Sequence, residues 1–236
     1  MTSSAAFPIA ELLPEIRRTL ETGTRLVLEA PPGAGKTTQL PLALLDAHWL
    51  RGRKIVILEP RRVAARAAAQ FMAKQLGEAV GETVGYRIRF ENKVSAKTRI
   101  EVVTEGILTR MLQDDPMLGE GGLGEGGLGE GGLGESGPDN IGAILFDEFH
   151  ERHLAGDLGL ALALDVQTGL REDLRLVVMS ATLDGERLAA FLDAPRLSSA
   201  GRSFPVRIAH FPARRDEAIE HQVKRAVEHA LAGHPG

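Results

Sequence analysis

The sequence predicts an α/β fold, a mostly parallel sheet flanked by helices, and three observations predict it. Segments of strand length and mainly apolar composition recur along the chain, at residues 26–28, 54–59, 141–146 and 174–179. Segments with helical periodicity separate these runs, and buried strands alternating with helices are typical of parallel sheets. The first run leads into a Gly/Pro loop that ends in Gly35-Lys36-Thr37. Strand, glycine loop and helix in this order are the setting of a phosphate-binding loop.

The loop after the first strand is therefore predicted to bind nucleotide phosphates. Gly33 and Gly35 lack the Cβ atoms that would keep backbone amides from turning toward an anion. The following helix adds its positive N-terminus, Lys36 can reach the β- and γ-phosphates, and the Thr37 hydroxyl can ligand Mg²⁺. The predicted nucleotide contacts in this loop are Gly33, Ala34, Gly35, Lys36, Thr37 and Thr38.

One position departs from the phosphate-loop pattern G-x-x-x-x-G-K-[ST]. Ala30 stands where the pattern has its first glycine. The departure is mild, because the amides nearest the phosphates come from residues 33–37. The alternative interpretation is a simple Gly-rich turn between a strand and a helix.

Composition limits the possible classes of protein. The 236 residues are 43% hydrophobic and include no cysteine, so disulfides, thiolate metal sites and cysteine nucleophiles are excluded. The start of the chain is polar and no run of 18 apolar residues occurs, so a cytoplasmic protein without a membrane span is expected. The net charge of −4 equals the charge of the four glutamates in one repetitive insert, so the rest of the chain is neutral. Aromatic residues make up only 4% of the chain, so any nucleic acid would be bound mainly through its backbone.

The first half of the chain predicts alternating helices and strands. We expect helices at 8–22, 37–50, 60–76 and 104–112, and strands at 54–59, 83–90 and 99–103. Arg61 and Arg62 come at the carboxyl end of a strand, where open α/β sheets bind ligands. They are either solvated surface residues or contacts to nucleic-acid phosphates. Thr104 can cap the helix that it precedes, contact phosphate, or do both.

Residues 118–135 form a Leu-Gly-Glu-Gly-Gly repeat. This composition cannot form a packed core, because glycine maximises chain entropy and one leucine in five residues buries little apolar surface. We expect a mobile insert that takes no part in the chemistry of the site. It should emerge at the amino ends of the strands.

The second half of the chain carries an acidic pair after the buried run at 141–146. Asp147 is predicted to hold Mg²⁺ through water, and Glu148 to orient and deprotonate an attacking water. Without the phosphate loop upstream, this pair would be an ordinary polar turn. Further on, we expect a strand at 174–179 ending in the hydroxyls of Ser180 and Thr182. Helices at 158–170, 185–192 and 213–231 and a strand at 204–211 complete the prediction.

Seven ordered motifs resemble those of the DEAH-box helicases. They are GAGKTTQ (33–39), PRRVAAR (60–66), VGYRIRFEN (84–92), TEGIL (104–108), DEFHER (147–152), SATLD (180–184) and RSFPV (202–206). Phe149 stands where most of the family has alanine, as in the bacterial HrpB-type branch. The motifs span nearly the whole chain outside the insert. The resemblance implies a RecA-like P-loop NTPase domain, here the N-terminal motor half of an ATP-dependent helicase.

The same resemblance implies roles for individual residues. Lys36, Thr37, Asp147 and Glu148 would serve ATP or ADP and Mg²⁺. His150 would relay the loss of the γ-phosphate to Ser180 and Thr182, and Arg61, Arg62 and Thr104 would contact single-stranded nucleic acid, with RNA favoured. Phe71 stands where relatives can carry an arginine that stacks on the base.

The predicted organisation is a RecA-like domain at 1–212 and a C-terminal helix at 213–236. Family members continue into a second RecA-like domain with arginine fingers, which would be the partner of this one. Two other functions stay open from the residues alone, a P-loop switch or phosphotransferase that does not act on nucleic acid, and a non-catalytic nucleic-acid-binding module.

Overall fold

The computed structural model describes residues 7–119, 140–181, 185–199 and 217–233, together with positions 208, 210 and 212. The chain divides into two compact units, residues 1–202 and residues 203–236.

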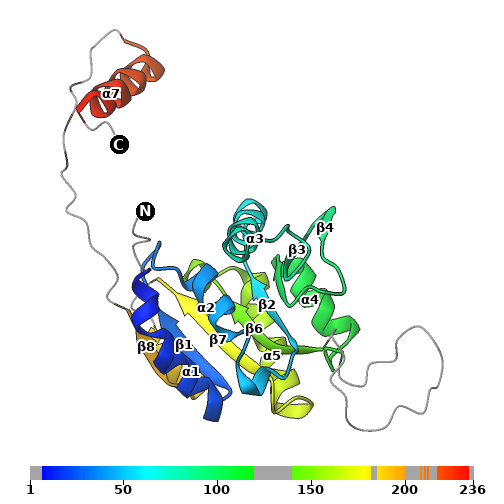
Figure 1. The fold of residues 1–236 in the computed structure, drawn as a ribbon. Helices are drawn as coiled ribbons and strands as arrows, with labels where there is room; N and C mark the ends of the chain where they lie inside the picture. Colours follow the sequence, from blue (N-terminus) through cyan, green and yellow to red (C-terminus); the bar gives the residue numbers. More distant parts are fainter. Residues whose placement is uncertain are drawn as a thin grey trace. The chain divides into compact units, whose positions relative to one another are not determined.

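The first unit is built on an eight-stranded sheet with the strand order β4-β3-β5-β2-β6-β7-β1-β8 (Figure 1). The strands are β1 (Arg25–Glu29), β2 (Lys54–Leu58), β3 (Val84–Ile88), β4 (Glu91–Lys93), β5 (Ile100–Val103), β6 (Ile141–Phe146), β7 (Arg175–Ser180) and β8 (Arg196–Ser198). All neighbours pair in parallel except β3 and β4, which form an antiparallel hairpin at one edge. The predicted α/β fold with a mostly parallel sheet is confirmed, and the two short edge strands β4 and β8 are additions to it.

Helices connect the parallel strands. The first unit contains η1 (Pro8–Glu11), α1 (Leu13–Thr22), α2 (Lys36–Leu44), η2 (His48–Leu50), α3 (Arg62–Leu76), α4 (Glu105–Asp114), η3 (Phe149–Glu151), α5 (Leu154–Gly169) and α6 (Gly185–Leu192). The single helix predicted at 8–22 is a 3-10 turn followed by α1. Pro14 lies in the first turn of α1, where its missing N–H costs nothing, but it cannot donate the hydrogen bond that would continue η1. The helix predicted at 37–50 likewise ends at Leu44, with a 3-10 turn after it.

Both faces of the sheet are covered, as the continuous apolar strands predict. Leu26 and Leu145 belong to the hydrophobic cluster beneath α1, α2 and α3. Their chain neighbours Val27 and Ile144 belong to the opposite cluster, beneath α4, α5 and α6. Successive strand residues point to opposite faces, so each strand contributes to two cores. The residues that follow the strands then lie together at the edge where the parallel strands end.

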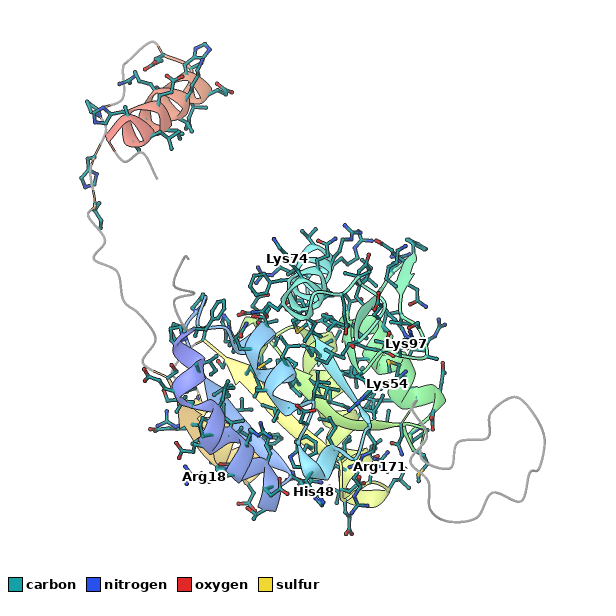
Figure 2. All side chains as sticks on the ribbon, viewed as in Figure 1. Arg18, His48, Lys54, Lys74, Lys97 and Arg171 are labelled. Atoms are coloured by element: carbon teal, nitrogen blue, oxygen red, sulfur yellow. The ribbon has the colours of Figure 1, made fainter. Side chains whose placement is uncertain are left out.

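The opposite edge, where the strands begin, is held by buried arginines. Figure 2 labels Arg171 and His48 at this edge. The guanidinium of Arg171 is 2% exposed and donates to the carbonyl oxygens of Met117 at 2.7 Å and Ile141 at 3.0 Å. It also donates to Asp173 Oδ1 at 2.9 Å. Burial alone would raise the pKa of Asp173, but hydrogen bonds from Arg171 and Arg53 outweigh it and hold that pKa well below its usual range.

Arg171 thus fixes both chain ends next to the Gly-rich insert. The insert prediction began at Leu118, and here it is wrong, because Leu118 is 3% exposed and packs in the core with Ile141. The Ile141 amide donates to the Leu118 carbonyl at 3.0 Å. Residues 120–139, which contain the rest of the repeat, lie outside the described residues.

The second unit contains α7 (Ile219–Gly233), which overlaps the helix predicted at 213–231 but starts six residues later and ends two residues later. Its apolar side chains Ile219, Val223, Val227 and Leu231 are exposed and recur every fourth residue. Most of the strand predicted at 204–211 lies outside the described residues. No helix within the described ranges is long and apolar enough to span a membrane.

Candidate functional site

The phosphate loop joins β1 to α2 and has the backbone that an anion site requires. Gly33 and Gly35 have φ angles of 78° and 93°, in the left-handed region that favours glycine. A Cβ atom on Gly35 would lie 2.9 Å from both Gln39 Cγ and Phe7 Cβ, so a larger residue does not fit. Within the described part of the chain, the amides of Gly33, Gly35, Lys36 and Thr37 donate to no backbone carbonyl. A row of unpartnered amides at a helix N-terminus fits the phosphates of a nucleotide.

The side chains of the loop meet the end of β6. Lys36 is 3% exposed, and its Nζ lies 2.9 Å from Glu148 Oε1 and 3.9 Å from Asp147 Oδ1. The hydroxyl of Thr37 donates to Asp147 Oδ2. The strand order places β6 two strands from β1, which brings together residues more than 100 positions apart in sequence.

Asp147 and Glu148 sit in a turn that leaves the buried strand β6. The Glu148 amide donates to Asp147 Oδ1 at 2.8 Å, and Glu148 has a φ angle of 49°, unusual for a residue with a side chain. Burial raises the pKa of Asp147 above its ordinary value, although Lys36 and Thr37 oppose the shift. A cation beside this carboxylate would favour its ionised form.

The donor set fits Mg²⁺ rather than a metal held by protein alone. Among the described residues, no group of three or more His, Cys, Asp or Glu side chains is arranged to hold a metal ion. Mg²⁺ is commonly held by one or two protein oxygens together with substrate phosphates and water. The adjacent oxygens of Thr37 and Asp147 suit that mode.

His150 connects the acidic turn to the end of β7. Its Nδ1 accepts a hydrogen bond from the Ala181 amide at 3.3 Å and lies 3.4 Å from Glu148 Oε2. Ser180 is buried at the end of β7, and its carbonyl accepts from the Ala30 amide at 3.0 Å. The segment that begins at Ser180 therefore touches both the phosphate loop and the acidic turn. Thr182, the other predicted coupling residue, lies outside the described residues.

The predicted nucleic-acid contacts lie at this same edge of the sheet. Arg61 is the N-cap residue of α3 and forms an ion pair with Glu151, whereas Arg62 is exposed and has no ion pair within the described ranges. Thr104 is the N-cap residue of α4. Its hydroxyl makes no capping hydrogen bond, so the predicted capping by the side chain is wrong. The backbone carbonyl of Thr104 accepts from the Ile107 amide at 2.9 Å instead, so that amide is paired without the side chain.

Phe71 lies on α3 and is 42% exposed. Its ring meets the edge of Phe7 with 6.2 Å between the centroids and an interplanar angle of 88°. Phe7 in turn lies against Gly35. Phe7, which no sequence pattern indicated, is the aromatic residue that links Phe71 to the phosphate loop.

Three carboxylates near this edge were also missed. Glu59 follows β2, and burial, together with the neighbouring Asp147, raises its pKa to about 7. Glu29 ends β1 and accepts from the Gly185 amide at 2.9 Å. Glu151 ends η3 and pairs with Arg61. An acidic residue directly after an apolar run was the signal that identified Asp147, and the same signal was available for Glu29 and Glu59.

Comparison with known proteins agrees with this geometry. Residues 11–191 match the DEAD/DEAH box helicase family. The chain is 46% identical over 233 residues to the ATP-dependent RNA helicase HrpB of Escherichia coli, covering 98% of this chain and 26% of that protein. It is 34% identical to the ATP-dependent RNA helicase HrpA of Borreliella burgdorferi, covering 87% of this chain and 22% of that one.

Solved structures give the same result. The crystal structure of the E. coli DEAH/RHA helicase HrpB has a TM-score of 0.80 and 47% identity over 96% of this chain and 26% of that one. That of the E. coli DExH-box NTPase HrpB has a TM-score of 0.74 and 45% identity over 98% of this chain and 26% of that one. The chain thus spans about a quarter of the length of HrpB. The resemblance and the RecA-like fold expected from it are confirmed, and the chain belongs to the DEAD/DEAH box helicase family.

Proposed function

We propose that this chain is the ATP-binding half of a nucleic-acid-dependent ATPase that translocates on and unwinds RNA or DNA strands in the full-length protein. The convergence of Lys36, Thr37, Asp147 and Glu148 carries the proposal. ATP or ADP would lie on the amides of residues 33–38, with Lys36 at its phosphates. Phe71 would lie near the base. A cytoplasmic location belongs to the proposal, since ATP and single-stranded RNA are both present there.

Bound Mg²⁺ would neutralise phosphate charge and help to align the phosphates for hydrolysis. Thr37 and Asp147 are the residues proposed to hold it. Glu148 is proposed to accept the proton of the attacking water, and its Oε1 lies 2.9 Å from Lys36 Nζ in the nucleotide-free site. His150 is proposed to pass the change at Glu148 to Ser180 and Thr182, supported by its contacts with Glu148 and the Ala181 amide.

The proposed nucleic-acid contacts are Arg61, Arg62 and Thr104. Both arginines begin α3 at the edge where the strands end, and phosphate is the partner that suits exposed arginines at a helix N-terminus. RNA is favoured over DNA because the helicases HrpB and HrpA named above are RNA helicases.

The proposed partner is a second RecA-like domain. The relatives are about four times longer than this chain, so the matched region leaves room for one. We propose residues 1–212 as the motor domain and 213–236 as the helix that leads to the second domain. Arginine fingers raise turnover by roughly 10³- to 10⁵-fold where they have been measured. The 236-residue chain should therefore bind Mg²⁺-ATP, hydrolyse it very slowly and unwind no duplex.

Nucleotide titration by calorimetry, paired with ATPase assays, tests the proposal. Lys36→Ala should lower the affinity for Mg²⁺-ADP at least about 100-fold, since it removes the lysine proposed to bind the phosphates. Lys74→Ala, an exposed lysine on α3, is the matched control and should bind as the wild type does. Arg62→Ala should weaken binding of single-stranded RNA uniformly across sequences. Equal nucleotide affinity in the wild type and Lys36→Ala would rule out the site.

The ATPase assay distinguishes the rival functions. A P-loop switch or phosphotransferase would bind nucleotide with no response to RNA, and a passive nucleic-acid binder would bind RNA without nucleotide. Adding the C-terminal portion of the full-length protein should raise turnover by orders of magnitude. RNA-stimulated turnover of several per second by the isolated chain would contradict the half-motor proposal.

A further inference from the structure

We propose that Glu151 is a positioning residue that couples the nucleic-acid contacts to the nucleotide site, because its ion pair with Arg61 is the contact that nucleic-acid phosphate must break. The inference rests on the proposed function and adds to it a residue and a physical mechanism.

Glu151 uses both carboxylate oxygens. Oε1 pairs with the Arg61 guanidinium, and Oε2 lies 3.0 Å from His153 Nε2. The Glu151 side chain is 24% exposed and the Arg61 side chain is 60% exposed. Arg61 is therefore held from the protein side by Glu151 while it remains accessible to an anion from solvent. A phosphate offers an arginine the same bidentate geometry as a carboxylate, so the two compete for one guanidinium.

Glu151 is the last residue of η3, the short turn that also contains His150. The residues on either side of this segment, Glu148 and Arg152, have φ angles of 49° and 50°, in the left-handed region. Non-glycine residues persist in that region only where surrounding contacts hold them. Lys36 holds the first end of the segment through Glu148, and Arg61 holds the other end through Glu151.

The two proposed ligands therefore act on opposite ends of one strained segment. Nucleotide phosphates would draw Lys36 away from Glu148, and nucleic-acid phosphate would draw Arg61 away from Glu151. Each event removes a contact that fixes the segment. Binding of one ligand therefore changes the binding free energy of the other. Such coupling is reciprocal, and either ligand can report it.

The experiment measures this coupling in the 236-residue chain. Binding of a fluorescent ADP with Mg²⁺ is titrated with and without a short oligouridylate, and oligouridylate binding is measured separately. The variants are Glu151→Gln, Arg61→Ala and the double variant. Asp114→Asn is the matched control, because it breaks an exposed ion pair on α4, Arg110 to Asp114 at 3.9 Å, and touches neither η3 nor the residues that bound it.

We expect Glu151→Gln to tighten oligouridylate binding by about 1.5- to 5-fold, the range of an exposed ion pair. Arg61→Ala should weaken that binding, and in its background Glu151→Gln should have no effect, since the competing pair is already gone. In the wild type the oligouridylate should change the ADP affinity, whereas in Glu151→Gln it should not. Asp114→Asn should behave as the wild type.

The failures are distinguishable. A Glu151→Gln variant that keeps the wild-type effect of RNA on ADP affinity, or that changes RNA affinity equally in both backgrounds, overturns the coupling role alone. A wild-type chain that binds both ligands independently also overturns it and leaves the proposed binding sites standing. A wild-type chain that binds neither ligand overturns the proposed function and this inference together.

Discussion

The ammonium group of Lys36 lies 2.9 Å from the carboxylate of Glu148, closer than the 3.9 Å that separates it from Asp147. The lysine proposed to bind phosphate is thus paired with the carboxylate proposed to activate water. Nucleotide phosphates must displace Glu148 from Lys36 in order to bind this lysine.

Glu148→Gln should strengthen Mg²⁺-ADP binding by roughly 3- to 10-fold, because phosphate no longer has to displace a charged partner from Lys36. Isothermal titration calorimetry on the wild type and the variant measures the change. Glu186→Gln is the control. It removes a carboxylate on α6 whose side chain is 80% exposed, and it should leave the affinity for Mg²⁺-ADP unchanged. Weaker binding by Glu148→Gln would contradict the competition.

Glu59 should make stability depend on pH. Burial, followed by Asp147, raises its folded-state pKa from 4.5 to about 7, so between these values the folded protein keeps a proton that the unfolded chain has lost. The free energy of unfolding therefore falls as pH rises from about 4.5 through about 7. Glu59→Gln, which mimics the protonated form, should be more stable than the wild type at pH 8 by about 1–3 kcal/mol, allowing for solvent screening, and within about 0.5 kcal/mol of it near pH 4.5.

Urea unfolding at the two pH values, with EDTA and without nucleotide, tests the Glu59 prediction. Glu82→Gln is the control, because Glu82 is exposed and its replacement should give the same small difference at both pH values. If the difference in the free energy of unfolding between Glu59→Gln and the wild type did not grow with pH, the prediction would be wrong.

Arg171→Met should lower the free energy of unfolding by about 3–5 kcal/mol, because it removes a donor to the carbonyls of Met117 and Ile141 and leaves Asp173 with Arg53 as its ion-pair partner. Arg110→Met is the matched control. The Arg110 side chain is 79% exposed and pairs with Asp114 at 3.9 Å, so its loss should cost less than about 0.5 kcal/mol. Equal losses in the two variants would show that Arg171 does not hold this edge.

Deletion of residues 121–135 should change the free energy of unfolding by less than about 1 kcal/mol. The hydrogen bond between Ile141 and Leu118 already holds the two flanking ends together at 3.0 Å, and closure entropy depends weakly on loop length. Leu118→Ala, by contrast, should cost about 2–4 kcal/mol because Leu118 is buried. Chemical unfolding compares the two, and a large loss from the deletion would show that the repeat contributes to packing.

Much of the fold could be predicted because it depends on local signals. Apolar runs of strand length identified β2, β6 and β7, and two glycines before Lys36 identified the loop between β1 and α2. The short edge strands β4 and β8 carry no apolar run, so periodicity could not find them.

The sequence by itself determined the family, the α/β class and the edge of the sheet at which the site lies, because motif spacing and strand periodicity are properties of neighbouring residues. Only the tertiary structure decided which of these residues touch. Lys36 reaches Glu148 across 112 positions and Arg61 reaches Glu151 across 90. It also decided that Leu118 is core and that Glu59 shares its surroundings with Asp147. Such pairs depend on the order of strands in the sheet, and that order is set by the packing of whole elements, which no local pattern encodes.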